Sequence, residues 1–551
     1  MLRVKWMVPL LLGLGLLIVG VAWVYLKPEK VVLTGQVMTE EGPAANAVVR
    51  VRTSDTFTVT DENGRFELET APFDKPIKVT AWSLGYLTGE SEVKQADTPI
   101  AITLTRYYTT DNPDYAWFSH EGATGSLACS NCHVCYDEWL ADAHSRSAVN
   151  PRVLSVYNGT DLNGTKGAVT QYEFDQAAGI EIPLAPSLGQ DGVGVGFRLD
   201  YPDLGGNCAT CHAPAAALNA ESAYQVDMNT LSGIETEGVF CEFCHKTGAV
   251  TLNPVTNIPN ISLPGVLSMQ LYRPAEDEEL FFGNLDDVPQ PDTYLPLFEE
   301  SAFCAPCHTG NFWGTTIYNS YGEWLASPYS DPERGKTCQD CHMPPVDYEY
   351  FVFPERGGLT RNPETVFSHR MPGAADTNLL QNTAELDVKA VCENDQLAVT
   401  VAVTNTGAGH DIPTDNPLRN VILVVNASTA DGQVLTLTDG PTIPEWGGVG
   451  DPEQGYYAGL PGVLYAKILA DYYTGETPSM AYWRQTRIVS DNRIHALETD
   501  ETHYQFDLPN GNCDAVIDVQ LLLRRAFIDL MDQKAWDTPD MLMEQVILEV
   551  R

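Results

Sequence analysis

The sequence has few basic residues for its size: 32 Lys and Arg stand against 74 Asp and Glu in 551 residues, a formal net charge of −42. A protein that binds nucleic acid needs a basic face to meet the phosphates, so this composition excludes that class. Long low-complexity runs are also absent, and a hydrophobic content of 44% is typical of a globular chain. The acidic surplus instead permits docking to a basic partner, with an attraction that salt weakens.

The first thirty residues contain an uncharged run, Trp6–Leu26, with Arg3 and Lys5 before it. Twenty-one helical residues span about 31 Å, which matches a hydrocarbon core of about 30 Å. The run ends without the small-residue A-x-A pattern at which signal peptides are cleaved. We therefore expect residues 1–30 to form an uncleaved anchor and the protein to be a single-pass protein of the cytoplasmic membrane.

Residues 31–106 alternate apolar and polar side chains in short runs, a pattern typical of a small antiparallel β-sandwich. Asp61-Glu62-Asn63-Gly64 predicts a hairpin turn between two of these strands. The segments 34–37, 60–66 and 80–86 (TGQV, TDENGRF and TAWSLGY) also resemble the carboxypeptidase regulatory-like domain. That resemblance implies a non-catalytic spacer.

The remainder of the chain divides into two regions. Residues 107–381 have weak periodicity, frequent Gly and Pro, and eleven of the thirteen cysteines, so we expect a mostly α-helical or irregular domain there. Residues 382–551 return to Val-rich alternating runs, which predict a second, immunoglobulin-like β-sandwich with some helix near residues 525–536. With the anchor and the first sandwich, this gives four parts in all.

Five copies of the motif Cys-x-x-Cys-His lie in the middle region. They are Cys129–His133, Cys208–His212, Cys241–His245, Cys304–His308 and Cys338–His342, and the second cysteines are Cys132, Cys211, Cys244, Cys307 and Cys341. In a c-type haem, two thiols at this spacing form thioethers with the porphyrin vinyl groups, and the next residue presents an imidazole to the iron. The motifs therefore predict His133, His212, His245, His308 and His342 as proximal iron ligands.

The number of motifs excludes coincidence. A chain with 13 Cys and 11 His in 551 residues is expected to contain about 0.006 such motifs by chance. Zinc or iron–sulfur sites also use paired cysteines, but they do not require a histidine directly after the second cysteine each time. The sequence predicts five covalently attached c-type haems.

The middle and C-terminal regions resemble the multihaem cytochromes related to the tetrahaem electron acceptor of hydroxylamine oxidoreductase. Three stretches carry the resemblance: Trp139–His144, where Asp142 stands in the place of the family's serine, Ser368–Gly373 after Cys341-His342-Met343-Pro344, and Asn405–Thr414. The resemblance covers residues 115 to 551 and departs from the tetrahaem pattern by a fifth haem. It implies electron transfer, and it names no partner.

Six histidines lie outside the motifs, and four of them are candidates for the second axial position. The candidates are His120, His144, His369 and His410. A carrier haem is usually six-coordinate, and the resemblance supports His369 and His410, whereas His120 rests on position alone. His144 follows His133 by eleven residues, about three helical turns, so both could point from one side of a helix toward different haems.

Four candidates for five haems leave one position to be filled. Met228, Met269 or Met371 could supply it; otherwise one haem is five-coordinate. His495 and His503 lie far from the motifs in the sequence, and we do not expect them to bind iron.

Three cysteines remain outside the motifs: Cys135, Cys392 and Cys513. Two alternatives remain for them: a Cys392–Cys513 disulfide, or buried free thiols. Because three is an odd number, at least one thiol stays unpaired within the chain.

Three functions follow from these patterns. The leading expectation is a membrane-anchored electron carrier, not an enzyme, whose bulk lies on the extracytoplasmic side and passes single electrons between redox proteins such as basic cytochromes. The second is an oxidoreductase acting on a small nitrogen or sulfur compound at a five-coordinate haem; the pentahaem nitrite reductases are disfavoured because all five motifs end in His. The third is a subunit of an extracellular cytochrome assembly or respiratory complex, as a homo- or hetero-oligomer.

Overall fold

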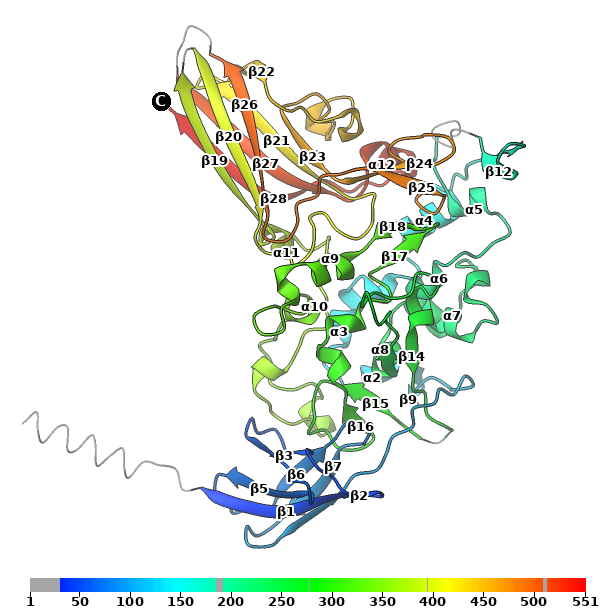
Figure 1. Ribbon diagram of the computed structural model, residues 1–551, viewed down its shortest axis with the longest axis vertical. Coiled ribbons are helices and arrows are strands. Elements are labelled where there is room, and N and C mark those ends of the chain that lie inside the picture. The colour runs from blue at the N-terminus through cyan, green and yellow to red at the C-terminus, as the bar shows by residue number, and fades with distance from the viewer. Residues whose placement is uncertain (1–29, 185–191, 277, 394, 509–512) are drawn as a thin grey trace, which may run out of the picture. The chain divides into compact units, whose positions relative to one another are not determined.

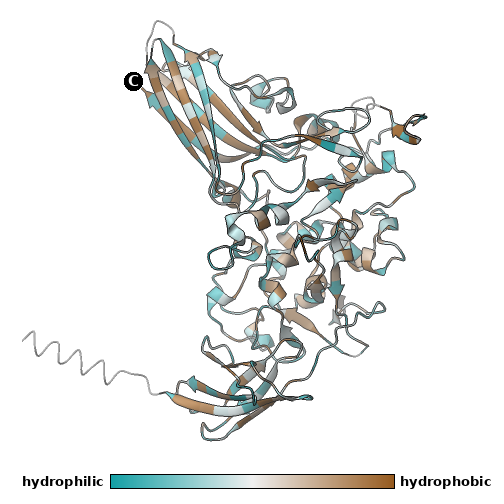
Figure 2. Ribbon diagram, in the orientation of Figure 1, coloured by the Kyte–Doolittle hydropathy of each residue, from teal (hydrophilic) through white to brown (hydrophobic). Residues whose placement is uncertain are grey.

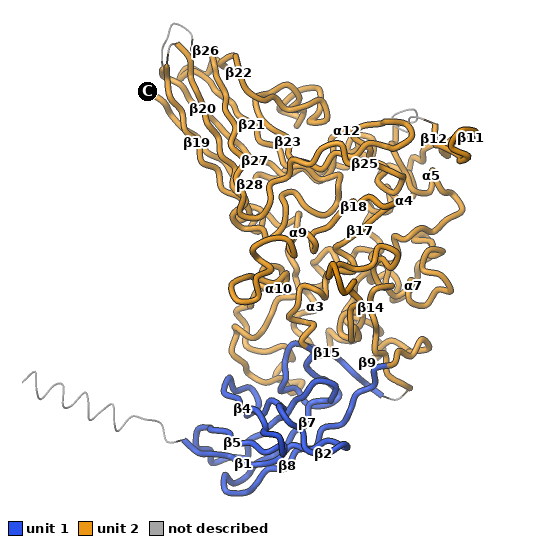
Figure 3. Tube along the Cα trace, in the orientation of Figure 1, with its two compact units in different colours: residues 1–109, 277–295 blue, residues 110–276, 296–551 orange. Residues whose placement is uncertain are grey.

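The computed structural model describes residues 30–184, 192–276, 278–393, 395–508 and 513–551, and it divides into two compact units. The first unit comprises residues up to Thr109 together with Asp277–Leu295, and the second comprises Thr110–Glu276 and Pro296–Arg551 (Figure 3). The sequence places 277–295 inside the region of the motifs, whereas the structure groups this segment with the N-terminal residues.

The first unit is a β-sandwich of two four-stranded sheets. One sheet contains β1 (Val31–Thr39), β2 (Gly42–Pro43), β5 (Arg65–Thr70) and β8 (Ile100–Thr103), and the other contains β3 (Val48–Val51), β4 (Phe57–Val59), β6 (Ile77–Trp82) and β7 (Gly89–Val93). Alternate residues of both sheets, such as Leu33, Phe66 and Val79, are buried between them. The Asp61–Gly64 turn joins β4 to β5, which belong to different sheets, so the predicted hairpin is wrong.

The segment 277–295 adds two short parallel strands to the first unit, β15 (Phe281–Gly283) and β16 (Asp292–Tyr294). Trp82 Nε1 donates to the Tyr294 carbonyl at 3.0 Å, and Arg50 pairs with Asp286 at 2.7 Å. The Phe282 side chain is 1% exposed. This segment is therefore bonded to the sheet of the first unit that contains Trp82 and Arg50.

The motif-bearing part of the second unit is built from short helices and two-stranded sheets (Figure 1). The helices are α2 (Ser126–Cys129), α3 (Tyr136–Ala141), α4 (Pro151–Asn158), α5 (Phe197–Asp200), α6 (Ala209–His212), α7 (Pro214–Asn219), α8 (Cys241–His245), α9 (Ser320–Ala326), α10 (Cys338–His342) and α11 (Thr377–Gln381). The strand pairs are β9 (Ser119–His120) with β10 (Ala123–Thr124), β11 (Tyr172–Asp175) with β12 (Ile180–Pro183), β13 (Thr247–Val250) with β14 (Met269–Leu271), and β17 (Gly310–Phe312) with β18 (Thr315–Tyr318).

The C-terminal part is a second sandwich with longer strands. One sheet has the order β19 (Ala384–Glu393), β20 (Gln396–Asn405), β26 (Thr499–Asp507), β22 (Leu437–Asp439), and the other β23 (Gly462–Tyr465), β21 (Asn420–Thr429), β27 (Ala515–Arg524), β28 (Met541–Val550). Hydropathy alternates along several of these strands (Figure 2), and in β20 the inward residues Leu397, Val399 and Val401 are at most 1% exposed. A disulfide joins Cys392 of β19 to Cys513, so of the two alternatives the structure contains the bridge.

The expectation of a mostly helical or irregular domain over residues 107–381 is wrong. Of the described residues, 19% are helical and 32% lie in strands, so this multidomain chain is β-rich. In the described part of residues 107–381 the longest α-helix has eight residues, α4. The frequent Gly and Pro of this region account for the short helices, because both residues end helices after one or two turns.

The predicted membrane localisation also needs correction. Across the five described ranges, no helix has both the length and the apolar character needed to span a bilayer. The predicted anchor, residues 1–30, lies outside these ranges except for its last residue. A single-pass membrane protein is therefore not supported.

A buried ionic group connects α5 with the loop between β24 (Lys467–Asp471) and β25 (Thr486–Asp491). Arg484 donates to both carboxylate oxygens of Asp200, at 2.8 and 2.6 Å, and lies 3.7 Å from Asp471. Glu476 is close to this group, and burial, opposed by Arg484 and reinforced by the two aspartates, raises its pKa to about 7. The cluster thus carries three carboxyl groups and one guanidinium.

Replacing Glu476 with glutamine is expected to stabilise the protein at alkaline pH. Because the folded pKa, about 7, lies above the ordinary value of 4.5, the wild type is most stable below pH 4.5 and loses stability as pH rises to 7. Glutamine removes this loss, which we expect to be on the order of 1 kcal/mol because Glu476 is only half-buried. Unfolding by denaturant at pH 4 and pH 8 measures it; Glu453→Gln, an exposed change, should show no pH-dependent difference.

Candidate haem-binding site

The five motifs lie on or directly after short helical elements. Three motifs form single helical turns, in α6, α8 and α10; the first follows α2, and the fourth continues a 3-10 turn, Ser301–Phe303. In the first, second and fourth motifs the histidine N–H donates to the carbonyl of the first cysteine, as in His212 N to Cys208 O at 2.9 Å. A single helical turn is enough for haem attachment, because it places both thiols and the imidazole on one side of the turn.

The motif thiols are deep in the protein and yet keep accessible surface. All ten are half-buried and none forms a disulfide. Burial raises the pKa of Cys208 and of Cys244 to about 12. Thiols that are surrounded by protein and still accessible fit the attachment of a large planar group along one edge.

Three motif histidines face three of the predicted second ligands. The ring centroids are 6.2 Å apart for His308 and His144, 6.3 Å for His245 and His369, and 6.4 Å for His342 and His410. A histidine nitrogen binds a transition metal at about 2.0 Å and lies about 1.1 Å from its ring centroid, so two imidazoles on opposite sides of one iron have centroids about 6.2 Å apart. Each pair therefore has the spacing of two axial ligands.

The proton positions agree with this role. A carbonyl or carboxylate oxygen only accepts, so a histidine whose Nδ1 is bonded to one keeps its Nε2 lone pair free. This bond is present in five of the histidines: His144 to Asp142 Oδ1 (2.6 Å), His212 to Ser147 O (3.2 Å), His342 to Pro372 O (2.6 Å), His369 to Phe367 O (3.2 Å) and His410 to Asp411 O (3.0 Å). Burial also lowers the pKa of His212, His308 and His369, which favours the neutral, ligating form.

Other side chains that the sequence reasoning missed hold the second ligands in place. Glu138 of α3 accepts from the His369 backbone N–H at 2.7 Å and from the Tyr348 hydroxyl at 3.0 Å. Asn405, at the end of β20, donates to the His410 carbonyl at 2.8 Å, so a strand of the C-terminal sandwich positions this histidine. Only Asp142 gave a signal in the sequence, as a departure from the family pattern.

The helical argument for His144 is wrong, and its role as an iron ligand stays a prediction. α3 begins at Tyr136, after His133, and ends at Ala141, and Asp142 is extended (φ −82°, ψ 159°). His144 instead lies in a separate 3-10 turn, His144–Arg146. It faces His308 rather than sharing a helix side with His133.

The fourth candidate, His120, is not brought opposite a motif histidine. It lies on β9, 42% exposed, with its ring centroid 6.2 Å from that of Phe118 and its Nε2 3.6 Å from Glu121. His495 and His503 are exposed on the C-terminal sandwich, next to Asp411 and Glu501. In the part of the chain that the structure describes, His133 and His212 make no ring contact with another histidine.

No family model matches the sequence, and no curated protein matches it. Among solved structures, the chain is similar to a pentahaem cytochrome c552 from Thermochromatium tepidum, with a TM-score of 0.52, 18% sequence identity, and 77% of this chain and 98% of that chain covered. The chain has a multihaem cytochrome c fold. This confirms the coarser part of the sequence prediction, while the relation to the tetrahaem acceptor and the carboxypeptidase regulatory-like resemblance stay predictions.

Within this multihaem fold, Gly265 separates two motifs. Its φ is +55°, its N–H donates to the Pro306 carbonyl at 2.9 Å, and a Cβ there would lie 2.2 Å from the Thr210 oxygen and 2.8 Å from the Cys211 sulfur. Only glycine fits, because a side chain would displace the thiol that must meet a vinyl group.

Replacing Gly265 with alanine is expected to lower haem attachment at the second motif and to cost at least about 1 kcal/mol of stability. The mass distribution of the purified protein measures attachment, and a new population lighter by one haem is the expected result. Gly283→Ala, where nothing lies within 4 Å of the added carbon, is the matched control. Full attachment in both variants would contradict the role assigned to Gly265.

Proposed function

We propose that this protein is a pentahaem c-type cytochrome that carries single electrons between redox proteins. The observation that supports this most strongly is the set of three histidine pairs, each combining one motif histidine with one distant histidine at the spacing of two ligands on one iron. Bound haem supplies one-electron iron chemistry, and an iron with two imidazoles has no open position for a substrate.

The ten motif cysteines hold five haems in this proposal, and the five motif histidines are the proximal ligands. His144, His369 and His410 are the second ligands for the fourth, third and fifth motifs. His120 stays the predicted second ligand of the first motif, next to α2. The second motif, which ends at His212, has no remaining histidine.

Interactions between cysteines of different motifs support one order for the proposed haems. Cys241 interacts with Cys129, Cys307 with Cys211, and Cys338 with Cys304. The first motif therefore adjoins the third, and the fourth adjoins both the second and the fifth. Cys244 of the third motif also lies within electrostatic reach of Cys304 and Cys307, which joins the two groups at the fourth motif. Thioether edges this close suit electron transfer between neighbouring haems.

A basic redox protein is the partner class that the charge favours. The net charge of −42 attracts such a protein at low ionic strength, and salt would weaken the encounter.

A reaction with a small molecule at the second motif is the second candidate function, and it is favoured by the surroundings of His212. The hydroxyls of Tyr318 and Tyr482 form no hydrogen bond in the described part of the chain, and Asp415 interacts electrostatically with both tyrosines and with His212. A haem on His212 without a second imidazole could expose its iron to a small ligand.

Mass spectrometry and electron paramagnetic resonance of the purified ferric protein test the proposal together. We expect a mass exceeding that of the polypeptide by five haems, and low-spin signals from at least three of them. A dominant high-spin signal would contradict the carrier function, and a mass equal to the bare polypeptide would contradict haem attachment itself.

A further inference from the structure

Asp142 sets His144 apart from the other second ligands. Its side chain is 5% exposed, and its Oδ1 lies 2.6 Å from His144 Nδ1 and 2.8 Å from the His144 backbone nitrogen. Asp142 also forms no ion pair with Lys or Arg in the described part of the chain. The carboxyl group of a buried aspartate is therefore directed at this one imidazole.

The corresponding bonds of the other second ligands are neutral. His369 donates to the Phe367 carbonyl at 3.2 Å and His410 to the Asp411 carbonyl at 3.0 Å. A carbonyl is a weaker acceptor than a carboxylate, because hydrogen bonds to ionised groups are shorter and stronger. His144 is thus the second ligand with the strongest pull on its Nδ1 proton.

This difference acts on the iron through the ring. A carboxylate that draws the Nδ1 proton makes the imidazole more electron-rich and the Nε2 atom a stronger donor. A stronger donor, and a negative charge nearby, stabilise ferric over ferrous iron, so the reduction potential falls.

We propose that Asp142 is a positioning residue that gives the haem between His144 and His308 a lower reduction potential than the haems of the His245–His369 and His342–His410 pairs. The inference rests on the proposed function, since it requires His144 to bind iron. It also has a consequence for conduction, because the fourth motif joins the two groups of haems. Electrons crossing between the groups pass a low-potential step.

The ring planes allow this haem to be recognised. The His144 and His308 rings are inclined by 68°, whereas the other two pairs are inclined by 20° and 16°. Low-spin ferric haems with nearly perpendicular imidazoles give a large-gmax resonance, and those with nearly parallel imidazoles give a rhombic one. The large-gmax signal therefore reports the His144–His308 haem.

Potentiometry of Asp142→Asn, followed by this signal, is the test. Asparagine keeps an acceptor oxygen of similar shape without the charge, so the haem should stay low-spin. We expect its reduction equilibrium at fixed potential to shift about tenfold toward ferrous iron, which is about 59 mV for one electron. The rhombic signals should keep their midpoints, and so should every haem in Asp137→Asn, an exposed change on α3.

Either of two results in Asp142→Asn would overturn the inference: an unchanged midpoint, or a conversion to high spin, which would make Asp142 only a support for the ring. An equal shift in Asp137→Asn would also overturn it, because surface charge would then be the cause. His144→Ala distinguishes a failure of the ligand assignment from a failure of the role proposed for Asp142. If it leaves the spectrum unchanged, the ligand assignment itself fails; if it creates a high-spin haem while Asp142→Asn shifts nothing, only the role of Asp142 fails.

Discussion

Replacing His369 with alanine is expected to convert one haem from low spin to high spin. His369 lies opposite His245 at 6.3 Å between ring centroids, and its Nδ1 is bonded to a carbonyl, which leaves Nε2 for the iron. Removing the imidazole leaves that iron with one strong axial ligand, and five-coordinate ferric haem is high-spin. Electron paramagnetic resonance should show a new high-spin signal equivalent to one haem, with loss of one low-spin signal.

A matched control for this change is His503→Ala. His503 is exposed on β26 and bonds to Thr400, so its loss should leave the haem spectrum unchanged. The same holds for covalent attachment, because neither variant alters a cysteine, and both should carry the same number of haems by mass. A His369→Ala protein with the wild-type spectrum would remove this residue from the ligand set.

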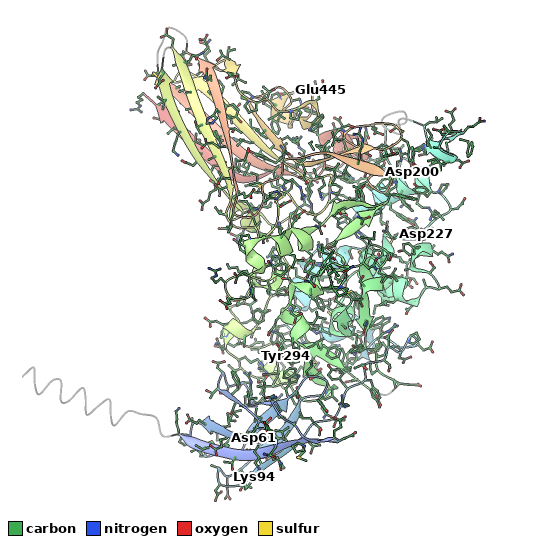
Figure 4. The ribbon with its side chains drawn as sticks, in the orientation of Figure 1. Asp61, Lys94, Asp200, Asp227, Tyr294 and Glu445 are labelled. Carbon is green, nitrogen blue, oxygen red and sulfur yellow. A yellow bond between two sulfur atoms is a disulfide. The ribbon has the colours of Figure 1, made fainter. Side chains whose placement is uncertain are left out.

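Replacing Asp200 with alanine is expected to produce the largest loss of stability of the changes considered. Asp200 is 1% exposed, and it accepts from Arg484 twice and from the Trp483 indole at 2.7 Å (Figure 4). Removing one member of a buried ion pair leaves an uncompensated charge, which costs about 3–5 kcal/mol. Denaturant unfolding should show a correspondingly lower midpoint.

Asp203→Ala is the control for that change. Asp203 lies three residues further along, in the loop that follows α5, and is exposed, so its removal should alter the unfolding free energy by less than about 0.5 kcal/mol. Equal effects of the two substitutions would mean that the Asp200–Arg484 pair does not hold α5 to the β24–β25 loop.

The covalent part of the site could be predicted from the sequence because it is local. Two thiols and an imidazole within five residues identify an attachment point without any knowledge of the fold. The pairing of second ligands could not be predicted in this way. His144 faces His308 across 164 residues of chain, and the helical phase that seemed to place it relates to a helix that ends before it.

The fold was predictable where side chains alternate and unpredictable where they do not. Within the Val-rich runs predicted for residues 382–551, β20 alternates and buries one face, whereas residues 421–425 of β21 are apolar on both faces and buried on both. The middle region has no such alternation. Its short helices and strand pairs are not marked by any periodic pattern of apolar residues, so they could not be predicted from the sequence. The Asp61–Gly64 turn was located correctly, but its strands pair elsewhere, because pairing partners are set by tertiary contacts.

The membership of residues 277–295 in the first unit has a consequence for engineering this protein. The chain passes between the two units three times, after Thr109, before Asp277 and after Leu295. A deletion of the N-terminal residues alone would expose the buried Phe282 side chain to solvent and remove Arg50, the ion-pair partner of Asp286. A shortened version without the first unit therefore has to remove two segments, one of them between the third and fourth motifs. The first unit is thus interleaved in sequence with the motif-bearing part and cannot be exchanged as one continuous segment.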